Sequence, residues 1–109
     1  MTTWTVDSAS SPAIASITSP QAITDAGDIT LIAAGSYSFR KTIPAAFAVT
    51  WSAGVSPFTF TDGAGNAGTY NITFNPPGGY TINGQANAKL EFNYQSITLV
   101  LDGTNYLII

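Results

Sequence analysis

The side chains that could do chemistry in this 109-residue chain are a few carboxylates, because it contains no histidine and no cysteine. It therefore lacks the usual general base, the commonest metal ligand and any thiolate nucleophile. Asp62, Glu91 and Asp102 are the candidates for the carboxylate pair that glycoside hydrolysis requires. Asp62 and Asp102 each precede a glycine in a turn, and Glu91 alternates with apolar neighbours and should face solvent. We expect no catalytic residue and no enzymatic activity.

Residues 62–66 carry oxygen-bearing side chains at a spacing found in calcium-binding loops. Position 64 is alanine, and no glutamate closes the loop, so a structural turn is the favoured interpretation. Gly63, Gly65 and Gly68 also fit a loose G-x-G-x-x-G pattern. A dinucleotide site needs a helix after that pattern, and here the following residues predict a strand. We expect neither a metal nor a cofactor.

Aromatic side chains are the remaining candidates for a binding surface. They could stack on sugar rings, but they are also the usual filling of a small β core and are enriched at protein interfaces, so we expect core or subunit contacts for most of them. Tyr80 and Tyr94 stand beside turns and should be the most exposed. The tryptophans and tyrosines are Trp4, Trp51, Tyr37, Tyr70, Tyr80, Tyr94 and Tyr106.

The composition is poor in charge: 8% of the residues are charged and 45% are hydrophobic, with a net charge of −3. An average soluble domain has about a quarter charged residues, so this surface is suited to being covered by partners in an assembly. Three basic residues are too few for binding nucleic acid through phosphate contacts. No apolar run approaches the length of a membrane helix, and residues 1–11 lack the features of a signal peptide.

The elements that must position these residues are short strands, because apolar and polar residues alternate with a period of two and no helical period occurs. The turn at Asn83-Gly84 is the strongest hairpin signal, and residues 62–68 should be a tight connection between strands. The pattern predicts an all-β fold, a small antiparallel sandwich or barrel-like domain. Strands are expected at 28–33, 36–42, 47–51, 58–61, 70–75, 80–82, 88–92, 96–101 and 106–109.

The chain divides into an extended N-terminal arm, residues 1–27, and a β domain, residues 28–109. The arm is rich in Ser, Thr, Ala and Pro and should become ordered on another surface, a frayed terminus being the alternative. The final strand is apolar on both faces and suggests either a sandwich core or a subunit interface. The expected attachment residues are Trp4, Val6, Ile14, Ile17 and Ile23; those of the subunit interface are Tyr106, Leu107, Ile108 and Ile109.

From about residue 49 to 109 the chain resembles a module found in tailed-bacteriophage structural proteins, among them tail fibres, head fibres and small capsid decoration proteins. Three turn-centred blocks carry the resemblance: 58–74, 78–84 and 96–109. The module often has an aromatic residue, commonly Trp, where Tyr106 stands here. The resemblance covers roughly 60 residues and leaves residues 1–48 outside, where attachment would be determined.

The resemblance implies a virion component that is assembled in the host cytoplasm, is usually homotrimeric and has no enzymatic activity. A decoration (cement) or head-fibre protein that binds the outer surface of the major capsid protein is the favoured expectation, since the chain starts at Met1 and has no long fibre shaft. The alternative is a tail-fibre module that recognises a glycan on the host surface. An enzyme, the third interpretation, would require a deep cleft lined by carboxylates.

Overall fold

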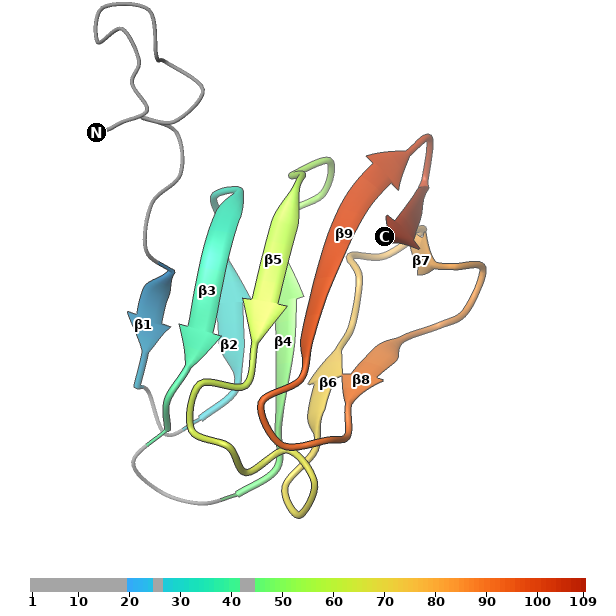
Figure 1. The fold of residues 1–109 in the computed structure, drawn as a ribbon. Coiled ribbons are helices and arrows are strands. Elements are labelled where there is room, and N and C mark those ends of the chain that lie inside the picture. Colours follow the sequence, from blue (N-terminus) through green and yellow to red (C-terminus); the bar gives the residue numbers. More distant parts are fainter. Residues whose placement is uncertain (1–19, 25–26, 42–44) are drawn as a thin grey trace, which may run out of the picture.

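Two β-sheets lie face to face in the computed structural model, which describes residues 20–24, 27–41 and 45–109 (Figure 1). Sheet A contains, in spatial order, β1 (Gln21–Ile23), β3 (Gly35–Phe39), β5 (Phe58–Thr61), β9 (Ser96–Asp102), β10 (Asn105–Ile108) and β7 (Thr81–Ile82). Sheet B contains β2 (Ile29–Leu31), β4 (Phe47–Trp51), β6 (Ile72–Phe74) and β8 (Ala88–Leu90). The described residues contain no helix long and apolar enough to span a membrane.

The first six strands alternate between the two sheets, so that the chain winds as a small β-solenoid of about three turns. Each strand pairs in parallel with the strand one coil earlier: β1 with β3 and β3 with β5 in sheet A, β2 with β4 and β4 with β6 in sheet B. The prediction of an all-β fold is confirmed, and the prediction of an antiparallel sandwich or barrel is wrong.

The error concerns the connections between strands, which are mostly corners rather than hairpins. Residues 62–71 lead from β5 in sheet A to β6 in sheet B, where a hairpin would have kept both strands in one sheet. Period-two alternation is the same for parallel and antiparallel strands, so the sequence pattern could not distinguish these arrangements. Whether neighbouring strands pair in parallel or antiparallel depends on which of the two sheets receives the next strand of the chain.

Two predicted turns have different outcomes. Gly103 and Thr104 join β9 and β10 as an antiparallel hairpin, with Gly103 at a φ of +68°. Asn83 and Gly84 also form a tight turn, with φ values of +47° and +75°, but it closes only a single bridge between Ile82 and Gln85. β7 then pairs in parallel with β10 and not with β8. The local turn was predicted correctly and the pairing of its flanking strands was not.

Strand positions agree with the prediction better than strand pairing does. β4 and β5 have the predicted bounds, and most of the other observed strands are shorter than predicted at one or both ends. β1 was missed: it falls in the segment expected to be an arm, pairs with β3 and buries Ile23. Residues 1–19 and 25–26 of the arm lie outside the described residues.

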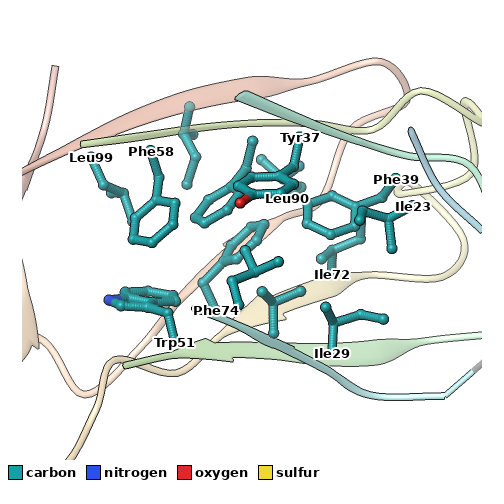
Figure 2. Packing of buried hydrophobic residues seen from close by; sticks show 14 of the residues in the cluster. Ile23, Ile29, Tyr37, Phe39, Trp51, Phe58, Ile72, Phe74, Leu90 and Leu99 are labelled. Atoms are coloured by element: carbon teal, nitrogen blue, oxygen red, sulfur yellow. The ribbon is translucent and has the colours of Figure 1, made fainter. Parts of the chain in front are cut away.

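The core lies between the sheets, where the coils place similar side chains in register (Figure 2). In sheet B, Ile29 pairs with Val49, and Val49 pairs with Phe74. Phe60 of sheet A stacks on Phe74 of sheet B, with ring centroids 4.4 Å apart and planes 8° apart. Such aromatic pairs contribute about 0.5–1.5 kcal/mol beyond the burial of their area. The aromatic rings therefore hold the two layers of the solenoid together.

After β6 the winding reverses and the coils end. β8 pairs antiparallel with β6, and β9 pairs antiparallel with β5. The chain therefore passes from sheet B back to sheet A at residues 91–95, at the same end of the molecule as the 62–71 connection. These two corner segments lie against each other and are joined by hydrogen bonds from Gly68 N to Asn93 Oδ1 and from Tyr94 N to Asp62 Oδ2.

Candidate functional site

Asp62 joins the two corners. Its side chain is 2% exposed, and its carboxylate accepts hydrogen bonds from three backbone N–H groups: Gly65 at 3.1 Å, Ala67 at 2.9 Å and Tyr94 at 3.0 Å. The first two bonds shape the loop after β5, and the third ties it to the turn between β8 and β9. Since the carboxylate oxygens face N–H donors, this geometry is that of a structural turn, the interpretation the sequence favoured over a calcium loop.

The turn at residues 91–95, hereafter the aromatic corner, is held by its own polar side chains. Gln95 Oε1 accepts hydrogen bonds from Glu91 N at 2.8 Å and Phe92 N at 3.2 Å. Asn93 Oδ1 accepts a hydrogen bond from Gly68 N at 2.9 Å, in the neighbouring loop. The backbone of the aromatic corner is therefore fixed from both sides, although its side chains point largely into solvent.

Two aromatic side chains of this corner are exposed: Phe92 to 71% and Tyr94 to 70%. Tyr94 has a φ of +63°, in the left-handed region that favours glycine, and its ring lies against Gly65, whose φ is +76°. A Cβ added at Gly65 would lie 2.3 Å from the Tyr94 ring, so glycine is required for this close approach. The prediction that Tyr94 is exposed is confirmed; Tyr80, expected to be similar, is half-buried.

Among the three carboxylates considered for hydrolysis, the two turn aspartates, Asp62 and Asp102, lie too far apart to act as a pair. Asp62 is next to the start of β9, since its N–H donates to Gln95 O at 2.9 Å, whereas Asp102 is the last residue of that strand. Six residue steps along a strand span about 20 Å, well beyond the roughly 5–9.5 Å between glycosidase carboxylates. Glu91 and Asp102 are both exposed. The described residues contain no group of three or more His, Cys, Asp or Glu side chains that could hold a metal.

A small crevice lies beside Asp62. It encloses about 10 Å³ and is lined by Phe39, Lys41, Asp62, Asn66 and Tyr70, among others. This volume holds about one water molecule. Lys41 Nζ is engaged nearby, donating to Gly27 O at 2.6 Å and lying 4.0 Å from the centre of the Phe47 ring. The crevice is too small to bind a substrate.

The opposite end of the core contains Trp51 and Tyr106. Their rings meet edge to face at 5.3 Å, and the Tyr106 hydroxyl donates to Val55 O at 2.7 Å. Burial raises the pKa of Tyr106 above its usual 10.0, the Trp51 indole opposes this shift, and Tyr80 adds to it. Trp51 Nε1 is buried without a hydrogen-bond partner of acceptable geometry. These groups form part of the core.

The residues proposed for attachment and subunit contact are in different environments. Ile23 packs in the core, and Trp4, Val6, Ile14 and Ile17 lie outside the described residues. In the C-terminal strand, Tyr106 is fully buried and Leu107 is half-buried, whereas Ile108 and Ile109 are 38% and 76% exposed. Of the four residues expected at the subunit interface, Leu107, Ile108 and Ile109 are therefore at least partly accessible at the surface, and Tyr106 is not.

Sequence reasoning found Tyr94 but missed the site around it. The sequence shows a tyrosine beside a turn; the positive φ and the bond to Asp62 depend on a contact between residues 32 positions apart. The short polar run Asn93-Tyr94-Gln95 between two apolar strands was the only available signal. No protein-family model and no curated protein matches the chain, so the likeness to bacteriophage structural proteins stays a hypothesis.

Proposed function

We propose that this chain is a non-enzymatic, trimeric component of a bacteriophage virion that binds the outer surface of the capsid, as a decoration or head-fibre protein. The proposal is supported by the resemblance of residues 49–109 to such modules and by the low charge of the chain, 8% of its residues. It is also supported by an apolar surface on β9 and β10, which is the observation that carries a contact between subunits, whereas the number of three subunits comes from the resemblance.

This surface, the C-terminal patch, consists of Val100, Leu107 and Ile109. Leu107 is the register partner of Val100, and both are half-buried on the outer face of sheet A, since Leu99 and Tyr106 face the core. Ile109 is held beside them because its N–H donates to Thr98 O at 3.0 Å, yet 76% of its side chain is exposed. An apolar side chain fixed in solvent gains free energy when a partner covers it, at about 25 cal/mol per Å² of buried apolar area.

The oligomeric state tests this part of the proposal. Light scattering coupled to gel filtration should give the mass of a trimer for the unmodified chain and of a monomer for the double variant Leu107→Ser/Ile109→Ser. Ile32→Ser is the matched control, because Ile32 is 80% exposed and lies just after β2 in the other sheet. A monomeric unmodified chain, or a double variant that remains a trimer, would reject the C-terminal patch as the subunit contact.

Attachment to the shell is tested separately. Deleting residues 1–19 leaves β1 in place, so the shortened chain should still form trimers. We expect it to lose binding to capsids stripped of this protein, whereas the full chain rebinds them. Cryo-electron microscopy of the parent particle should show trimeric density on the capsid surface. Full decoration by the shortened chain would remove the arm from attachment, and absence of the protein from purified virions would reject the function itself.

A further inference from the structure

The aromatic corner contains a residue that folding alone does not explain. Tyr94 adopts a φ of +63°, which glycine and asparagine accept far more readily than tyrosine. Its ring is 70% exposed, so it contributes little apolar burial to offset this backbone conformation. Strained residues of this kind occur where the surrounding structure imposes them and are common at sites that bind ligands. The ring at this position therefore needs a role outside the core.

The position of Tyr94 is set by the two corners together. Its N–H donates to the buried Asp62 carboxylate, and its ring rests on Gly65, where no side chain intervenes. Asp62 in turn fixes the Gly65 and Ala67 N–H groups, so the backbone of Tyr94 and the backbone beneath its ring are held by one carboxylate. A ring oriented before binding loses less conformational entropy when a ligand stacks on it.

Amide side chains lie on both corner segments that hold Tyr94. Asn93 Oδ1 accepts the Gly68 N–H, which fixes the side-chain orientation and leaves the Nδ2 hydrogens facing away from that bond. Asn66, next to Gly65 in the sequence, is exposed, and Phe92 offers a second exposed ring two residues before Tyr94. Sugars have apolar C–H faces that stack on aromatic rings and hydroxyl groups that pair with amides, and Glu91 is the one exposed carboxylate within this turn.

We propose that Phe92, Asn93 and Tyr94 form a binding site for a neutral saccharide, with the sugar ring stacked on Tyr94 and hydroxyl groups bound to the Asn93 amide. A nucleic acid is disfavoured, because a chain with a net charge of −3 and three basic residues offers few phosphate contacts. A protein partner is disfavoured because the other exposed residues of this turn, Glu91 and Asn93, carry a carboxylate and an amide and not further apolar side chains. The proposal does not depend on the chain being a virion component.

The test is a titration of the full chain with neutral oligosaccharides of glucose, galactose and N-acetylglucosamine, followed by NMR chemical shifts and saturation transfer to the sugar. At least one of the three should saturate the protein at millimolar concentration. Tyr94→Gly should weaken binding at least tenfold while its melting temperature stays equal or rises, because glycine fits the positive φ. Tyr94→Phe, which keeps the ring, should bind within about twofold of the unmodified chain, and Ile32→Ala, remote from the corner, should be unchanged.

Three results would overturn the proposal: no saturation with any of the three sugar series, unchanged binding by Tyr94→Gly, or binding that Ile32→Ala weakens as much. A Tyr94→Gly variant that instead loses trimer formation or capsid rebinding would identify the corner as a protein-docking surface. Light scattering on the same samples separates loss of the trimer from loss of sugar binding. A variant of the C-terminal patch, Leu107→Ser/Ile109→Ser, should lose the trimer and keep sugar binding.

Discussion

The parallel coils, β1–β6, and the C-terminal strands, β7–β10, are stabilised in different ways. The latter are called the antiparallel end, because all their pairings except that of β7 with β10 are antiparallel. In the coils, each strand repeats the position of the strand one coil earlier, and the core forms from rows such as Ile29, Val49 and Phe74. At the antiparallel end, single polar side chains make specific bonds to the backbone. Asn105 Oδ1 accepts from both Thr81 Oγ1 and Gly84 N at 2.8 Å, and Asn83 Oδ1 accepts from Ile108 N at 3.0 Å.

The difference shows what repetition supplies. A coil that stacks on a similar coil finds matching hydrogen-bond partners and a matching apolar row, and a side chain such as Asp28, which accepts from Ala48 N at 3.0 Å, adds to them. Where the winding reverses, the register is no longer inherited, so asparagine, glutamine and aspartate fix the loops individually. Substitutions in the coils should therefore act through packing, and substitutions at the end should act through single hydrogen bonds.

Phe60→Ala should have the largest effect. Phe60 is fully buried, stacks on Phe58 at 5.0 Å and on Phe74 at 4.4 Å, and so connects both sheets of the coils. We expect a loss of about 3–5 kcal/mol in the free energy of unfolding, measured by urea denaturation with circular dichroism. A loss below about 1 kcal/mol would show that the aromatic stack does not hold the layers together.

Asp62→Ala should come next, because it removes the link between the two regions. Three backbone N–H groups would lose their acceptor, at a cost on the order of 3 kcal/mol. Asp62→Asn, which keeps one acceptor oxygen, should lose less. Hydrogen exchange should then accelerate at Gly65, Ala67 and Tyr94 in Asp62→Ala while the strand amides of β4 stay protected. Equal acceleration in β4 would mean that the corners are not a separate unit.

Tyr106→Phe should have a smaller effect that depends on pH. At neutral pH it removes the bond to Val55 O and should cost about 1 kcal/mol. Because burial raises the pKa of Tyr106 in the folded chain, its full contribution is present below pH 10.0 and is lost as the pH rises through the folded value. The unmodified chain should thus lose more stability than Tyr106→Phe in alkaline urea titrations; identical alkaline slopes would contradict this.

Gly84→Ala and Gly65→Ala should have effects no larger than that of Tyr106→Phe and form a matched pair. Both glycines have nearly the same φ, +75° and +76°, so each alanine should cost about 1 kcal/mol for the left-handed backbone. Gly84 has open space around it, whereas a Cβ at Gly65 meets the Tyr94 ring. Since that ring is exposed, displacing it costs little apolar burial, so the two melting temperatures should be similar. Only Gly65→Ala should weaken saccharide binding, because the ring then leaves the position that Gly65 allows. A much less stable Gly65→Ala would mean that the ring cannot move.

The sequence was sufficient for strand positions and insufficient for their partners. Alternation located β4 and β5 to the residue, because the apolar side chains of both face one core. It could not show that a glycine-rich connection crosses to the other sheet, since glycine and aspartate suit corners and hairpins equally. β1 was missed because three residues after a proline carry too little pattern to identify a strand.

The same limit applies to the site. The exposure of Tyr94 followed from its place beside a turn, but its conformation depends on Asp62, which is distant in the sequence. In the sequence, an Asp-Gly turn gives the same signal whether the aspartate carboxylate accepts hydrogen bonds only from its own loop or also from a second loop. Long-range contacts of this kind become visible only when the two corners are seen side by side.

The reversal after β6 also gives the molecule a direction. β1 and β2 are the outermost strands of their sheets at one end, and both run parallel to the strands beside them. A duplicated coil inserted at that end would continue both hydrogen-bond ladders with unchanged polarity, whereas one inserted beyond β8 would meet a strand running the opposite way. Changes in the length of this architecture are therefore expected to accumulate on one side, while the corners that hold Tyr94 are inherited intact.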